Sequence, residues 1–285
     1  MSPFFLSALE GLGRRALAGR GFVSRVVSAG AEKAHAYDAK GRGTLAPVVI
    51  LHGIGASATS FMPVATALLN ESKRLILLEL PGHGSSPDLA VRPLTPRAIF
   101  RAVTHALDAL LDEPHVVVGN SLGGAVAIAH ALARPRQVRG LFLLSPAGAA
   151  FPKEDVEDVI STVRMKDRAG GNRFLDKLYH RTPLYARALA HELPGWMARD
   201  AVRELLEHAD ELAFTPDELA SLVPPTVLSW GRSERLLPRS AFDFLKEHLP
   251  AHTKVEEPND VGHCPQLDDP RALGRRLRAF LRETG

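Results

Sequence analysis

From Pro47 onward, short apolar runs alternate with longer segments in which apolar positions recur at helical spacing. The apolar runs end at Gly, Pro or Ser turn signals, and they predict strands at residues 48–51, 75–80, 116–118, 141–144 and 226–230. The amphipathic segments predict helices at residues 95–111, 122–133 and 271–282. Because strands of a parallel sheet are buried on both faces, this alternation is typical of the α/β class, with a mostly parallel central sheet flanked by helices.

The alternation is interrupted once, at residues 150–222. This span contains no convincing strand, and Gly170-Gly171, Pro183, Pro194 and Pro216 divide it into short helix-like pieces. We therefore expect a helical insertion that forms a lid. The predicted organisation is an N-terminal helical arm at residues 1–30, a core at residues 31–149 and 223–285, and the lid at residues 150–222.

The arm has an apolar face and a positive charge. Phe5, Leu9, Leu12 and Ala16 share one side of a helix, and arginines occur among and after them. Two interpretations remain open: a helix that packs this face on the body or the lid, and a basic amphipathic segment that makes a weak peripheral contact with a membrane surface.

Composition narrows the function classes. A formal net charge of +3, from 35 basic and 32 acidic residues, is too balanced to indicate a nucleic-acid partner. The single cysteine, Cys264, excludes an intramolecular disulfide framework and a cysteine-based zinc site, and it is interpreted as a buried small apolar side chain.

No apolar run is long enough to span a bilayer, and the first residues lack the basic start of a signal peptide. These observations predict a cytoplasmic protein, with the peripheral membrane contact left open, and they leave the oligomeric state undetermined.

Candidate chemistry lies at residues 119–123, which read Gly-Asn-Ser-Leu-Gly. The motif follows a buried strand and precedes an Ala-rich helix, so Ser121 is expected on a sharp strand-to-helix turn. Glycines two positions on either side prevent a side-chain collision there, and the helix N-terminus offers N–H groups to a developing negative charge. Ser121 is therefore the predicted nucleophile, against the alternative of a plain strand-to-helix connection.

In these motifs the chain resembles the α/β-hydrolase family, as a serine esterase or lipase-like member with a helical lid, from Pro47 to Leu281. The sequence Val-Ile-Leu-His-Gly at residues 49–53 is similar to the family's His-Gly turn, and residues 78–86 resemble its structural Pro-Gly-x-Gly loop. The resemblance implies an oxyanion hole formed by the backbone N–H groups of Ile54 and Leu122. His52 is interpreted as a structural turn residue.

The same resemblance selects the base and the acid from many candidates. His263 lies in a loop before the last predicted helix, where the family carries its catalytic histidine. Glu234, within Trp-Gly-Arg-Ser-Glu-Arg, occupies the place of the usual aspartate and is one methylene longer. A surface ion pair with Arg232 or Arg235 is the alternative for Glu234. The order Ser121, Glu234, His263 matches the family order.

The predicted reaction is hydrolysis of a small-molecule carboxylic ester, with an apolar acyl or aromatic group, through an acyl-enzyme and without metal or organic cofactor. Phe61, Trp196 and Met197 are candidate pocket walls. Hydrolysis of a carbon–carbon bond and cofactor-free perhydrolysis by the same triad are the alternatives within the family. A ligand receptor on the same fold is the alternative from another class.

Overall fold

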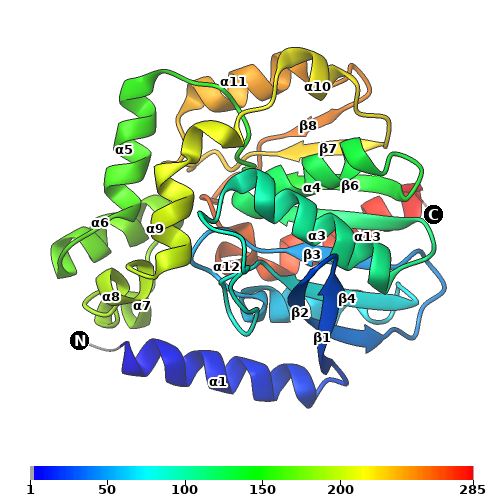
Figure 1. Cartoon of the computed structure of the whole chain (residues 1–285), viewed down its shortest axis with the longest axis horizontal. Coiled ribbons are helices and arrows are strands. Elements are labelled where there is room, and N and C mark those ends of the chain that lie inside the picture. Colours follow the sequence, from blue (N-terminus) through cyan, green and yellow to red (C-terminus); the bar gives the residue numbers. More distant parts are fainter. Residues whose placement is uncertain (1–2, 285) are drawn as a thin grey trace.

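The computed structural model describes residues 3–284 and has an eight-stranded sheet at its centre (Figure 1). The strand order is β1-β2-β4-β3-β5-β6-β7-β8, and all neighbours from β4 to β8 run parallel, whereas β1–β2 and β2–β4 are antiparallel. The strands are β1 (Val23–Ala29), β2 (Glu32–Lys40), β3 (Val48–Leu51), β4 (Arg74–Glu79), β5 (His115–Asn120), β6 (Val138–Leu144), β7 (Thr226–Ser229) and β8 (Lys254–Glu256).

Helices cover both faces of this sheet, which explains why β3 and β5 are buried throughout. One face packs against α3 (Pro96–Leu110), α4 (Leu122–Ala133) and α11 (Arg239–His248), with Val103, Val126 and Phe242 in the shared core. The other face packs against α2 (Met62–Leu68) and α13 (Pro270–Thr284). The α/β class and the mostly parallel sheet predicted from the sequence are confirmed.

The insertion between β6 and β7, residues 150–222, consists of short helices joined by loops and contains no strand. In Figure 1 most of its helices gather at one end of the sheet. They are α5 (Lys153–Val163), α6 (Arg168–Leu178), α7 (Leu184–Ala188), α8 (Leu193–Met197), α9 (Asp200–Glu207), the 3-10 turn η2 (Ala209–Leu212) and α10 (Pro216–Ala220).

The predicted helical arm at residues 1–30 is wrong in its second half. Helix α1 (Phe4–Ala18) ends before Gly19, and Gly21 has a φ of +89°, a left-handed conformation that glycine adopts readily. Residues 23–29 are edge strand β1, whose backbone groups pair with β2. Neither strand was predicted, because their polar side chains lack the apolar pattern of the central strands. Within residues 3–284, no helix combines the length and the apolar character that crossing a bilayer requires.

Candidate active site

Ser121 occupies a sharp turn between β5 and α4, with φ 54° and ψ −120°. The flanking glycines are required by close backbone contacts. A Cβ at Gly119 would lie 2.3 Å from the carbonyl oxygen of Gly123, and a Cβ at Gly123 would lie 2.3 Å from that of Leu51. The turn therefore holds Ser121 at the carboxyl end of a central strand, directly before a helix N-terminus.

The loop after β3 lies against this turn. A Cβ on Gly53 would come within 3.2 Å of the Ser121 Cβ, and the next residue, Ile54, lines the same cavity as Ser121. Leu122 is the first residue of α4, where backbone N–H groups have no acceptor within the helix. The two residues predicted for the oxyanion hole thus lie on either side of Ser121, one in the adjacent loop and one next in sequence.

His52 is a buried structural residue of this loop. Its Nε2 accepts a hydrogen bond from the Leu80 N–H at 3.1 Å, so its proton is on Nδ1, which donates to the Gly53 carbonyl at 2.8 Å. Burial, together with the nearby His83, lowers the pKa of His52 to about 3. The ring is neutral near pH 7 and connects β3 to the loop after β4.

His263 and Glu234 form a buried pair at the carboxyl end of the sheet. Their Nδ1 and Oε2 atoms are 2.8 Å apart, and the two side chains are 3% and 2% exposed. The other Glu234 oxygen accepts the N–H groups of Leu236 at 2.8 Å and Leu237 at 3.0 Å. Burial alone would raise the pKa of Glu234, but His263 and the hydrogen bond from Leu237 lower it below its usual value.

Of the two arginines that were alternative partners for Glu234, Arg232 and Arg235, the second is engaged elsewhere. Arg235 donates to the backbone carbonyls of Tyr179 and His180. A carboxylate that is almost fully buried cannot form a surface ion pair, so its charge acts on the imidazole of His263.

Polar contacts fix the His263 loop to the strand that carries Ser121. The Asn120 amide donates to the backbone carbonyls of Leu144 and His263, both at 3.0 Å, and its oxygen accepts from Gln266 at 3.0 Å. Asn120 and Gln266 are not among the residues predicted for the site. The available signal was an amide at the end of an otherwise apolar strand, since a buried polar group needs partners.

A second anchor of this loop joins it to the insertion. The Asp268 carboxylate accepts the Gly262 N–H at 2.7 Å and the His180 N–H at 3.0 Å. Asp268 therefore holds the backbone immediately before His263 against the segment that follows α6.

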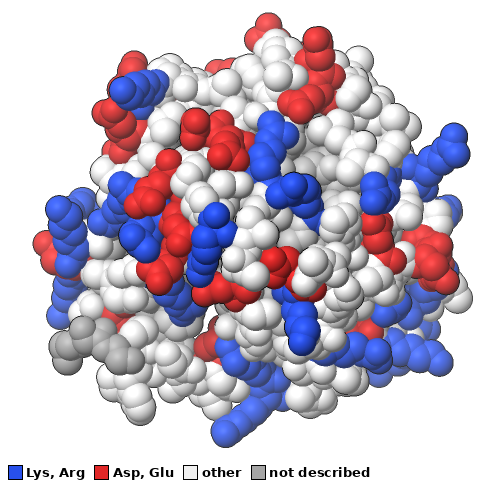
Figure 2. Space-filling model, in the orientation of Figure 1, with Lys and Arg blue, Asp and Glu red and all other residues white. Residues whose placement is uncertain are grey.

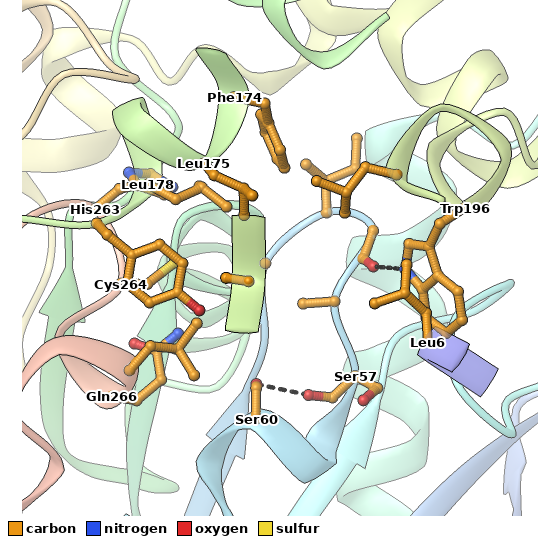
Figure 3. A pocket seen from close by; sticks show the side chains of 18 of the residues that line it. Leu6, Ser57, Ser60, Phe174, Leu175, Leu178, Trp196, His263, Cys264 and Gln266 are labelled. Atoms are coloured by element: carbon orange, nitrogen blue, oxygen red, sulfur yellow. Dashed lines mark hydrogen bonds between the residues drawn. The ribbon is translucent and has the colours of Figure 1, made fainter. Parts of the chain in front are cut away.

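Ser121 and His263 line a cavity of about 400 Å³ between the sheet and the insertion (Figure 3). Its walls are mainly apolar, and Trp196 is fixed there by a hydrogen bond from its Nε1 to the Gly55 carbonyl at 2.7 Å. The lining contributed by the insertion consists of Phe174, Leu175, Leu178, Tyr179, Tyr185, Ala186, Leu189, Leu193, Trp196 and Met197.

Of the three predicted wall residues, Trp196 and Met197 line the cavity, whereas Phe61 does not. Phe61 is fully buried in the core on the α2 and α13 side of the sheet. The prediction for Phe61 is wrong because the 3-10 turn η1 (Ala58–Phe61) directs its last side chain toward the sheet.

Helix α1 is a wall of the cavity that sequence analysis missed. Leu6, Leu9, Glu10 and Gly13 all line it. The Glu10 carboxylate accepts hydrogen bonds from the hydroxyls of Ser57 at 2.6 Å and Thr59 at 2.8 Å, and a Cβ on Gly13 would lie 2.8 Å from the Thr59 Cβ. The first turn of α1 is tied to the insertion, because the Phe5 and Leu6 N–H groups donate to Glu192 at 2.9 Å and 2.7 Å.

The described lining of the cavity carries little charge. Among residues 3–284, its lining includes no lysine or arginine, and Glu10 is its single carboxylate. Over the same range, no group of three or more His, Cys, Asp or Glu side chains could hold a metal ion. Cys264 is buried beside the Asn120 side chain, and burial raises the pKa of its thiol well above the usual value. A neutral apolar ligand fits this lining better than an anionic one.

A sequence model of the alpha/beta hydrolase family matches residues 48–276 of the chain. A pimeloyl-[acyl-carrier protein] methyl ester esterase of Nitrosomonas europaea is 30% identical over 78% of this chain and 90% of its own length. A 2-hydroxy-6-oxononadienedioate/2-hydroxy-6-oxononatrienedioate hydrolase of Cupriavidus pinatubonensis is 26% identical over 82% of this chain and 86% of its own. Among solved structures, a membrane phospholipase A superposes with a TM-score of 0.81 at 23% identity, covering 99% of this chain and 92% of that chain.

Proposed function

Because this chain belongs to the alpha/beta hydrolase family, and is a hydrolase, we propose that it cleaves carboxylic esters with Ser121 as nucleophile, His263 as base and Glu234 as acid. The observation that carries the proposal is the buried 2.8 Å contact between Glu234 and His263, at a cavity that Ser121 also lines. A carboxylate in this position holds the imidazole with its proton on Nδ1, which leaves Nε2 to accept the proton of the serine hydroxyl.

The reaction proceeds in two steps. Ser121 Oγ attacks the ester carbonyl as His263 takes its proton, and the N–H groups of Ile54 and Leu122 stabilise the oxyanion. His263 then protonates the departing alcohol, which leaves an acyl group on Ser121. A water then gives a proton to His263 and attacks the acyl-enzyme, and His263 passes that proton to Ser121 Oγ as the bond breaks and the carboxylic acid leaves. Glu234 remains ionised throughout and stabilises the imidazolium formed in each step.

The cavity favours an ester over a dienedioate substrate. A dienedioate carries two carboxylates, and buried carboxylates require cationic or hydrogen-bonding partners. The lining contributed by residues 3–284 has no lysine or arginine and already has one carboxylate, Glu10. Phe174, Leu175 and Trp196 instead provide an apolar surface for an acyl chain or an aromatic group. Residues 150–222 act as the lid that selects this group.

Two measurements test the proposal. A fluorophosphonate probe is expected to label the folded protein at Ser121 and to leave Ser121→Ala unlabelled, while a receptor without catalytic activity would remain unlabelled in both. A chain-length series of p-nitrophenyl esters is then expected to give the highest kcat/KM with an apolar acyl group longer than acetyl. Turnover of a ring-cleavage dienedioate that exceeds turnover of every ester would favour carbon–carbon bond hydrolysis instead.

A further inference from the structure

Helix α1 has two apolar faces, and only one of them is packed on the protein along its length. Leu6, Gly13 and Leu17 face the body, where Leu17 is fully buried. The face for which packing and membrane contact both remained open, which contains Phe5, Leu9 and Leu12, is largely exposed to solvent together with Phe4. A helix that is already packed along one side therefore exposes a second row of large apolar side chains, and exposed rows of this kind mark interaction sites.

This exposed face continues onto the insertion. Leu184 and Tyr185 of α7 are exposed, and in Figure 1 α7 and α8 lie next to the N-terminal half of α1. The six exposed side chains, which we call the apolar rim, are between 49% and 84% exposed: Phe4, Phe5, Leu9, Leu12, Leu184 and Tyr185. Glu192 holds the two parts together by accepting the first N–H groups of α1.

The apolar rim is continuous with the lining of the cavity. Leu9 and Tyr185 belong both to the rim and to the cavity lining, and their side chains are 49% and 63% exposed. These two residues come from α1 and α7, so the cavity wall reaches the solvent-exposed surface at both helices, and we infer that its entrance lies there. A molecule that enters there passes directly from the rim to the neighbourhood of Ser121.

Positive charge accompanies the rim. Arg15 and Arg20 follow it along the chain, are exposed, and form no ion pair within residues 3–284. In Figure 2 white and blue surface predominates along the lower edge, where α1 lies in Figure 1. Exposed phenylalanine and leucine on one helical face with arginine beside them are typical of a helix that lies in the interface of an anionic bilayer.

We propose that the apolar rim docks on the surface of an anionic phospholipid bilayer and places the cavity entrance against the lipid. Docking in this way would give the enzyme direct access to acyl esters that reside in the bilayer. This part of the inference rests on the proposed esterase function. A second copy of the chain fits this face less well, because it would close the entrance between Leu9 and Tyr185 and would cover the unpaired arginines with the same positive surface.

The test measures vesicle binding separately from catalysis. Full-length Ser121→Ala protein is sedimented with phosphatidylcholine vesicles and with vesicles that also contain phosphatidylglycerol. The rim variant combines Phe5→Ser, Leu12→Ser and Leu184→Ser, whose side chains are exposed and do not line the cavity. The matched control combines Val91→Ser and Val223→Ser, which remove exposed apolar side chains elsewhere.

The parent protein and the control are expected to bind anionic vesicles more tightly than neutral ones. The rim variant is expected to bind about a hundredfold more weakly, because each of its three side chains contributes apolar area to the docked state. Arg15→Gln is expected to reduce binding to anionic vesicles about fivefold and to leave binding to neutral vesicles unchanged.

With Ser121 restored, the rim variant is expected to hydrolyse a water-soluble p-nitrophenyl ester at the parent rate and a vesicle-embedded ester much more slowly. Loss of both activities would point to a damaged fold, which circular dichroism would reveal. Equal vesicle binding by parent and rim variant would overturn the proposal. So would light scattering that shows a dimer of the parent and a monomer of the rim variant. Failure of esterase activity alone would refute the proposed function and leave the binding result intact.

Discussion

Replacing Glu234 by glutamine changes the proton position on His263 while it preserves the shape of the side chain. In the parent protein, the Glu234 carboxylate accepts His263 Nδ1–H with one oxygen and the N–H groups of Leu236 and Leu237 with the other. In Glu234→Gln the amide oxygen must stay with the two backbone donors. Its NH₂ group then faces His263 and can donate only to an unprotonated Nδ1, which moves the imidazole proton to Nε2.

The expected effect is large in rate and small in stability. A His263 with its proton on Nε2 cannot accept the proton of Ser121, and a tautomer error of this kind lowers kcat about 10⁴-fold, or roughly 5.5 kcal/mol of barrier. All three hydrogen-bonding positions around residue 234 remain filled, so the free energy of unfolding should change little. Glu234→Ala, in contrast, leaves the N–H groups of Leu236 and Leu237 buried without partners, which costs about 2 to 6 kcal/mol of stability.

The assay compares kcat/KM on a p-nitrophenyl ester with urea unfolding for the parent, Glu234→Gln and Glu234→Ala. We expect Glu234→Gln to be folded and almost inactive, and Glu234→Ala to be both inactive and less stable. A kcat for Glu234→Gln within tenfold of the parent would refute the assignment of Glu234 as the acid.

Three further outcomes test other parts of the structure. Gly11→Ala should raise the free energy of unfolding by about 0.5 to 1 kcal/mol, because a Cβ there meets nothing within 4 Å. Gly13→Ala should instead lower the free energy of unfolding or raise KM, because its Cβ forces α1 away from η1. Equal shifts of urea unfolding in the two variants would contradict the close packing of Gly13. Asn120→Ala should lower kcat about a hundredfold by releasing the His263 loop, with fluorophosphonate labelling slowed to match, and an unchanged labelling rate would remove that positioning role. His130 is buried beside another histidine, and burial lowers its pKa to about 3, so its contribution to stability is complete above about pH 6.5 and declines as the pH falls toward 3. His130→Leu should therefore abolish about 2 kcal/mol of the stability lost between pH 7 and pH 5, measured by urea unfolding at both pH values.

The amino-acid sequence alone determined the parallel centre of the sheet and the strand-to-helix turn that carries Ser121. Strands such as 48–51 are apolar on both faces, and a run of this kind can be buried only in a sheet that is covered on both sides. The Gly-x-Ser-x-Gly turn could also be predicted from the sequence, because a side chain at position 119 or 123 would collide with nearby backbone atoms and only glycine fits there.

Tertiary structure decided what surrounds this sheet and this turn. Edge strand β1 and its neighbour β2 form through backbone pairing, which side-chain patterns predict only weakly. The sequence of α1 did not determine which of its faces packs. Leu6 and Leu17 lie on one apolar face and Phe5 and Leu12 on another, and the two faces are about 100° apart around the helix, the angle between successive residues. Phe61 became core and Leu6 became cavity wall for the same reason: apolar character predicts that a side chain is buried, and only the packed helices decide against what.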